Sequence, residues 1–115
     1  MIEVVEYLEV ALTRSFKVTV RERAQSDPAF RLALLTEAME LFLAGDMTTG
    51  RNLLADYVNA TIGYQALGKL TGTNPKSLMR MLGPKGNPRA NNLFGIIHEL
   101  QQHEGVRLEV RSISE

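Results

Sequence analysis

The chain has 115 residues, a size typical of one domain, and enough apolar residues for a modest core. It contains no cysteine, which excludes a disulfide framework and a thiolate metal site. No apolar run approaches the roughly 20 residues that span a bilayer. The first residues, MIEVVEYLEV, carry acids where a signal peptide carries bases. We therefore expect a soluble cytoplasmic protein with no membrane partner.

The net charge is zero overall, but it is unevenly distributed. Residues 1–56 carry nine acids and six bases, and residues 99–115 carry four acids and two bases. A zero net charge argues against a nucleic-acid binder, and chance clustering is one explanation of the pattern. An acid-free basic window, however, is typical of a surface that binds a polyanion. Residues 57–98 carry no acid and five bases, which are Lys69, Lys76, Arg80, Lys85 and Arg89.

The first half of the chain predicts three helices. Residues 2–25 have mixed periodicity, because their first half has helical spacing whereas Phe16 to Val20 alternates as in a strand; we favour a helix. Asp27-Pro28 begins a second helix, which Gly45 ends. A third helix is expected from about Thr49 to Thr61. The inward side chains expected for the second and third helices are Phe30, Leu34, Ala38, Leu41, Phe42, Leu53, Leu54, Tyr57 and Val58.

Two short helices with a tight link are expected next, over residues 64–71 and 74–82. A helix-turn-helix needs a small residue where its helices cross and a turn residue that tolerates positive φ, and Gly68 and Gly72 have the spacing for these roles. On spacing alone, an ordinary helical hairpin is the alternative; the acid-free window favours the helix-turn-helix. The expected inner anchors are Leu67, Leu70, Leu78 and Leu82.

A last helix is expected from Ala90 to His103, and Gly105 ends it. The tail VRLEVRSI, residues 106–113, alternates apolar and charged residues, as a half-buried strand does. Because a single strand in a helical chain has no partner, we expect this one to pair with its copy in a homodimer. The inward side chains expected for the last helix are Leu93, Ile96, Ile97 and Leu100.

Residues 60–110 resemble the Cro/CI-type (Xre) helix-turn-helix domain of HigA-like addiction-module antidote (antitoxin) proteins. The motifs that carry the resemblance are LGKLTG, NPKSLMRML, GNP and the LEV tail, and the upstream RAQSDPAFRLALLTEAMELFLAGD is similar to the helical N-terminal part of some members. The chain departs from the general pattern at Pro75, which stiffens the start of the second helix and removes one backbone donor. The resemblance implies a homodimer that binds double-stranded DNA at a palindromic operator, and a RelE-like toxin as partner.

The expected fold is mainly α, a lambda-repressor-like helix-turn-helix bundle with an N-terminal helical extension and a short C-terminal β-strand. We assign residues 1–48 to the extension, for dimerisation or partner binding, and residues 49–115 to the DNA-binding domain. The expected function is that of a transcriptional repressor, the antitoxin of a module that autoregulates its operon. The alternative is a module that sequesters a toxin and binds DNA weakly. An enzyme is not expected.

The DNA contacts follow from the way such a unit docks, with the N-terminal end of its second helix in the major groove. Lys76, Ser77 and Arg80 are the candidates for reading bases, and contact with phosphates or with solvent alone is the alternative for the two cations. Gln65, at the start of the preceding helix, suits a phosphate. The residues expected to hold the DNA backbone on the far side are Lys85, Asn87 and Arg89.

Two other segments of the sequence approach known binding motifs but depart from them. Gly63 to Leu70 approaches a phosphate-binding loop, but Leu70 stands where Ser or Thr must bind magnesium. His98-Glu99 and His103 have HExxxH spacing, which turns the two rings to different faces of a helix. We therefore expect no metal and no cofactor. Met39, Met79 and Met81 are expected as core filler, with an outward position beside the groove as the alternative for Met79.

Overall fold

The computed structural model describes the backbone of residues 14–115 and the side chains from residue 19 onward. Within this range the chain is mainly helical, as predicted, and forms no strand. The part of the first predicted helix before residue 14 lies outside the described residues. The helices are α2 (Arg14–Ser26), α3 (Pro28–Leu43), α4 (Met47–Ala60), α5 (Gly63–Thr71), α6 (Pro75–Met81) and α7 (Ala90–Glu104).

Aspartate and asparagine caps determine where three of these helices begin. The Asp27 carboxylate accepts a hydrogen bond from the Phe30 N–H at 3.2 Å, and Asp46 accepts one from the Thr49 N–H at 3.1 Å. The Asn74 side chain accepts one from the Lys76 N–H at 2.8 Å. Such caps satisfy donors that the first turn of a helix leaves unpaired. Because Asp46 is a cap, α4 begins two residues before the predicted start.

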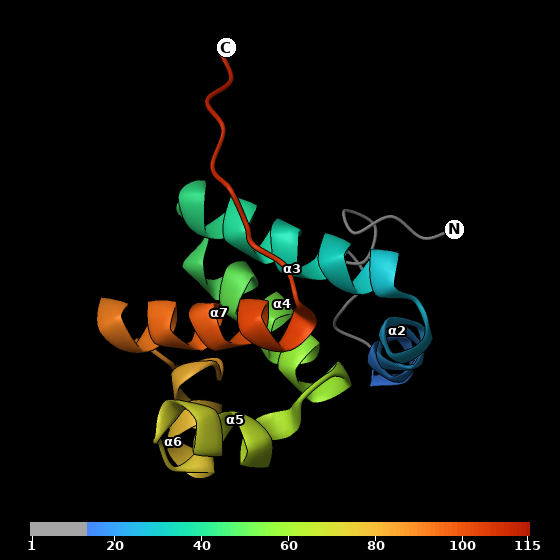
Figure 1. The fold of residues 1–115 in the computed structure, drawn as a ribbon, viewed down its shortest axis with the longest axis vertical. Coiled ribbons are helices and arrows are strands. Elements are labelled where there is room, and N and C mark those ends of the chain that lie inside the picture. Colours follow the sequence, from blue (N-terminus) through green and yellow to red (C-terminus); the bar gives the residue numbers. More distant parts are fainter. Residues whose placement is uncertain (1–13) are drawn as a thin grey trace.

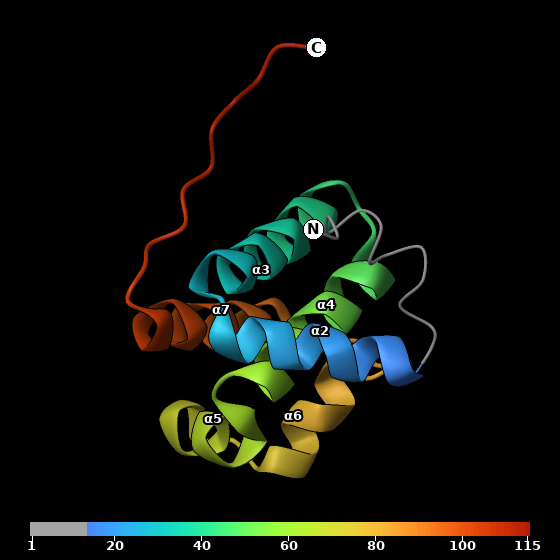
Figure 2. The same cartoon turned by 90° about the vertical axis from the view of Figure 1, so that its right-hand side faces the viewer.

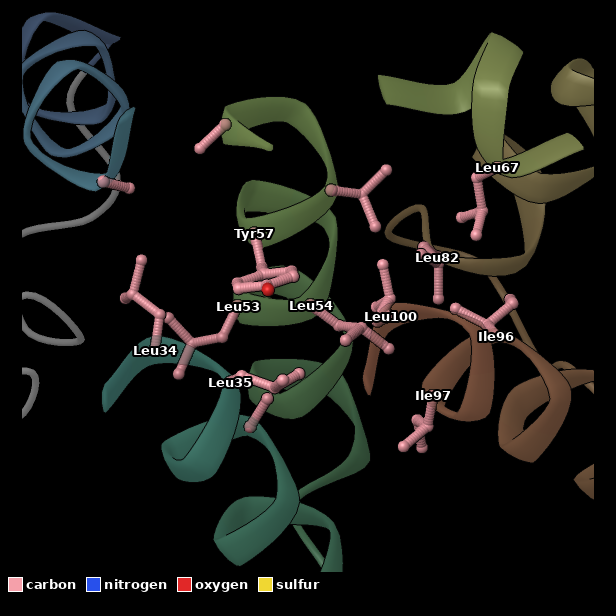
Figure 3. Packing of buried hydrophobic residues seen from close by; sticks show 14 of the residues in the cluster. Leu34, Leu35, Leu53, Leu54, Tyr57, Leu67, Leu82, Ile96, Ile97 and Leu100 are labelled. Atoms are coloured by element: carbon pink, nitrogen blue, oxygen red, sulfur yellow. The ribbon is translucent and has the colours of Figure 1, made fainter. Parts of the chain in front are cut away.

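The hydrophobic core is built around α4. Figure 3 shows Leu34 and Leu35 of α3 on one side of this helix and Leu100 of α7 on the other. The core therefore includes residues on both sides of position 48. The division of the chain at this position remains a prediction about the separate roles of residues 1–48 and 49–115. All inward side chains predicted for α4 and α7 are buried, as are three of those predicted for α3; Leu41 and Phe42 are partly buried against the core.

The helices α5 and α6 lie together at one end of the molecule, and α3 lies at the other end (Figures 1 and 2). Side chains of α7 connect the two ends. Ile96 lies next to Leu67 and Leu82 at the α5–α6 end, whereas Leu100 lies near α4 (Figure 3). Packing on α7 thus fixes the position of the α5–α6 pair relative to the body. No helix within residues 14–115 has the length and apolar character to cross a membrane.

The predicted C-terminal strand is not formed. Gly105 ends α7 with a φ of 74°, and the Leu108 N–H then donates to the Gln101 side-chain oxygen at 2.8 Å. After Leu108 the chain leads away from the helical body (Figures 1 and 2), and Val110 is 82% exposed. A strand exists only when a second strand satisfies its backbone groups, and residues 14–115 contain no second strand.

Candidate nucleic-acid interface

The helices α5 and α6 meet at Gly68. A Cβ atom on Gly68 would lie 2.7 Å from the Thr73 carbonyl oxygen and 3.2 Å from Cγ of Pro75, so no larger residue fits without a shift. Gly72 ends α5 with a φ of 68°, and the Thr73 N–H donates to the Gly68 carbonyl at 3.0 Å. The predicted positions of Gly68 at the crossing and Gly72 in the turn are confirmed for this pair of helices.

Three of the four predicted inner anchors of this pair are buried, namely Leu67, Leu78 and Leu82. The prediction for Leu70 is wrong, because its side chain is 50% exposed. At 100° per residue, Leu70 lies about 110° from the middle of the face that Leu67 and Gly68 turn inward. The inward positions at the ends of α5 are instead held by Tyr64 and Thr71, which are half-buried.

The outward face of α6 carries Lys76, Met79 and Arg80, which are all exposed. Helical geometry places these three side chains within an arc of about 100°. Ser77 lies about 60° beyond Arg80 around the helix, and its hydroxyl accepts a hydrogen bond from Nη2 of Arg80 at 3.3 Å. Of the predicted base readers, Lys76 and Arg80 therefore share one exposed face, and Ser77 orients Arg80 from its flank. The sequence favours Met79 as core filler, but its place three residues after Lys76 gives its side chain the same outward direction.

Lys85 is brought to this face by the loop that follows α6. The Gly83 N–H donates to the Arg80 carbonyl at 3.2 Å, and the Gly86 N–H donates to the Gly83 carbonyl at 2.9 Å. Any Cβ on Gly86 would collide with the Met81 carbonyl oxygen, so this close return of the chain requires glycine. Arg80 and Lys85 consequently line the same shallow hollow, at the helix end where carbonyl dipoles favour a cation.

The other predicted contacts lie at the starts of the helices on either side of α6. Gln65 is exposed in the first turn of α5, and Arg89 is exposed at the residue before α7. Neither Ile62 nor Arg89 caps its helix through a side-chain hydrogen bond, whereas α3, α4 and α6 are all capped in this way. Asn87 is exposed in the loop before α7. The residues that precede α5 and α7 therefore leave the first turns of these helices without a side-chain cap.

The five bases of the acid-free window are all exposed. Across the part of the chain that the structure describes, none of them forms an ion pair with an acid. The ion pairs found there lie elsewhere: Arg23–Asp27 at 3.6 Å, Arg31–Glu104 at 3.2 Å and Arg107–Glu109 at 3.3 Å. The positive charge on and beside α6 is thus not neutralised within the described chain and faces solvent.

A second hollow, of about 220 Å³, lies where α5 and α6 meet α7. Leu70, Gly95, His98 and Glu99 are among the residues that line it. His98 and His103 are both exposed on α7. No group of three His, Asp or Glu side chains in the described residues is arranged to hold a metal ion.

Comparisons with protein-family models, with curated proteins and with solved structures give no match for this chain. The candidate site is therefore defined by the geometry of the chain alone. It consists of the outward face of α6, the loop that returns over the end of this helix, and the first turns of α5 and α7.

Proposed function

We propose that this protein is a sequence-specific DNA-binding regulator, in which α5 and α6 form a helix-turn-helix of the Cro/CI type within a lambda-repressor-like bundle. The observation that carries the proposal is the outward face of α6, where Lys76 and Arg80 are exposed on a segment without acids. Base edges in the major groove are read by such a helix, and the phosphates beside it attract unpaired cations.

In this proposal, α6 enters the major groove and places Lys76 and Arg80 against base edges. Arginine recognises guanine through two parallel hydrogen bonds, which discriminate against a wrong base by about 1–3 kcal/mol. The hydrogen bond from Arg80 to Ser77 limits the rotation of the guanidinium before DNA arrives. An ordered side chain loses less conformational entropy on binding, so Ser77 supports readout through Arg80.

The phosphates on either side of the groove are contacted by the neighbouring helix starts. The first turn of α5 offers backbone donors that lack a side-chain cap, together with the Gln65 amide. On the far side, Lys85, Asn87 and Arg89 are exposed between α6 and α7. Contacts of this kind fix the register of the protein on the duplex and leave sequence reading to α6.

We further propose that the protein acts as a homodimeric repressor of its own operon, in the cytoplasm, and is the antitoxin of a toxin–antitoxin module. This part rests on the motifs of residues 60–110, which resemble HigA-like antidote proteins. A palindromic operator requires two copies of α6 related by a two-fold axis. The tail after Leu108 leads away from the α5–α6 end (Figures 1 and 2), so pairing of two tails leaves both reading helices uncovered.

A second candidate function is sequestration of a RelE-like toxin with little DNA binding. The observation that favours it is the exposed tail, where Val110 and Ile113 are 82% and 77% exposed. An extended segment with exposed apolar side chains can add a strand to a partner's sheet. Co-purification of a protein encoded by a neighbouring short gene, together with undetectable binding to the upstream DNA, would favour this function over repression.

The test of the primary proposal is binding to the native upstream intergenic DNA, measured by fluorescence anisotropy. We expect salt-dependent binding that exceeds binding to unrelated DNA, and a loss of both affinity and base preference in Arg80→Ala. Lys69→Ala is the matched control, because Lys69 is an exposed base of the same window on α5, outside the proposed contacts. Unchanged affinity and base preference in Arg80→Ala would remove Arg80 from the readout.

Phosphate contacts are tested by the salt dependence of the same binding reaction. A lost phosphate contact lowers the slope of log K against log[salt] by about 0.9 on B-DNA. We expect a decrease of about this size in Lys85→Ala, with similar loss on all sequences, and no change of slope in Lys69→Ala. An unchanged slope in Lys85→Ala would contradict the backbone role of Lys85.

A further inference from the structure

The outward face of α6 carries one apolar side chain among its polar ones, that of Met79. This side chain is 48% exposed, although α6 already supplies the core with the buried Leu78. Met81 of the same helix packs against the core, as expected of a methionine filler. Nothing in the packing of the described chain therefore accounts for Met79 at this position.

Met79 lines a shallow hollow on the protein surface. The hollow is lined by Met79, Arg80, Gly83, Pro84 and Lys85. The Met79 thioether and the Pro84 ring are its apolar side chains, and its charged side chains are the two cations. The hydrogen bonds of the Gly83 and Gly86 N–H groups hold the loop that supplies Pro84 and Lys85 to this lining. The hollow therefore offers an apolar surface next to positive charge.

A partner for this surface must combine negative charge with a small apolar group. The major groove of DNA meets both needs, because phosphates border it and the C5 methyl of thymine is the apolar group that base edges display there. We propose that Met79 reads a thymine methyl, with Pro84 beside it, next to the base that Arg80 contacts. The proposal rests on the proposed function and adds a specificity-determining residue and the base that it selects.

Its test begins with the duplex that the protein prefers, selected from a randomised DNA library. Each thymine of this duplex is then replaced in turn by deoxyuridine, which deletes the C5 methyl and keeps every hydrogen-bonding group. We expect one position at which the replacement weakens binding about fourfold, the factor that corresponds to one buried methylene-sized group. In Met79→Ala the two duplexes should bind equally, and Met79→Leu should restore part of the difference.

Leu70→Ala is the matched control, because Leu70 is an apolar residue with nearly the same exposure, 50%, on the neighbouring helix α5. This variant should keep the fourfold difference. If binding depends on Arg80 but no thymine is sensitive to the loss of its methyl group, the inference is overturned and the proposed function stands. The inference would also be overturned by a methyl effect that persists in Met79→Ala. Failure to select any duplex over unrelated DNA would instead overturn the proposed function.

Discussion

The phenol hydroxyl of Tyr57 donates a hydrogen bond to the Glu104 carboxylate, which joins the last turn of α4 to the last turn of α7. Nε of Arg31, on α3, donates to the same carboxylate at 3.2 Å, and its Nη1 donates to the Ala24 carbonyl of α2 at 2.8 Å. Glu104 thus receives donors from two other helices. Because α7 fixes the position of the α5–α6 pair, this polar cluster supports the candidate interface from a distance.

Replacement of Tyr57 by phenylalanine should destabilise the fold while keeping the ring in the core. Tyr57 is fully buried, and a hydrogen bond to a charged group contributes about 1.5–3 kcal/mol. We therefore expect Tyr57→Phe to lower the free energy of unfolding by about 1–3 kcal/mol, measured by urea denaturation. The control is Arg107→Ala, which breaks an ion pair whose side chains are 84% and 75% exposed and should cost less than about 1 kcal/mol. Equal losses in both variants would refute this ranking.

Two carboxyl groups should give the stability of the protein opposite dependences on pH. Burial raises the pKa of Asp56 from 3.8 to about 6, so its contribution is full below pH 4 and is lost as the pH rises through 6. Burial favours a higher pKa for Glu104, but hydrogen bonds from Tyr57 and Arg31 lower it below the usual 4.5. The contribution of Glu104 is therefore present above pH 4.5 and is lost as the pH falls through the lowered pKa.

Urea denaturation between pH 3 and pH 8 separates the two groups. Asp56→Asn should flatten the fall in stability between pH 4 and pH 6, because the amide has no ionised form whose burial would destabilise the fold. Glu104→Gln should lose stability mainly above pH 4.5, where the wild-type carboxylate is ionised. The assignment of Asp56 would be wrong if Asp56→Asn kept the wild-type slope between pH 4 and pH 6.

Much of this fold could be predicted because its signals are local. Apolar spacing identified the large buried apolar side chains of α4 and α7, and Asp27, Asn74, Gly72 and Gly105 marked helix ends through caps and left-handed turns. The cluster at Glu104 could not be predicted in this way. Its members are 47 and 73 residues apart in the chain, and no periodicity relates positions at such distances.

The wrong predictions have two physical origins. Leu70 lies on the flank of α5 and Met79 on the outward face of α6. In such short helices, the apolar character of a residue does not show whether its side chain points toward the core. The tail alternates as a strand does, yet its backbone finds no second strand within residues 14–115. Alternation reports a preference for pairing, whereas the presence of a partner depends on the assembly.

Replacement by alanine should change the stability of the protein in opposite directions at two glycines in helix interiors. A Cβ on Gly68 would press on the Thr73 carbonyl, whereas a Cβ on Gly95 would meet nothing within 4 Å. We expect Gly68→Ala to cost about 1–3 kcal/mol and to weaken DNA binding, because α5 and α6 must separate. Gly95→Ala should stabilise the protein by up to about 1 kcal/mol, since alanine favours a helix. Thermal and urea denaturation measure both, and stabilisation by Gly68→Ala would contradict the close crossing of α5 and α6.

The tail provides a test of the dimer. If the tail after Leu108 pairs with that of a second copy, its backbone N–H groups are the donors, and neighbouring residues point them to opposite sides. Proline removes this donor, so the double variant Glu109→Pro/Val110→Pro deletes one pairing donor in either register. Both residues are exposed and follow the contact between Leu108 and Gln101, so the helical body should keep its stability.

Light scattering at micromolar concentration measures the outcome. We expect a dimer for the wild-type chain and a monomer for the proline variant, while the control Glu109→Thr/Val110→Thr keeps its donors and its strand preference and stays dimeric. The monomer should bind a single operator half-site through α6 but should lose the added affinity of the two-fold site, because one copy reaches only one half. A monodisperse wild-type monomer would refute the paired tails, and a dimeric proline variant would place the dimer contact elsewhere in the chain.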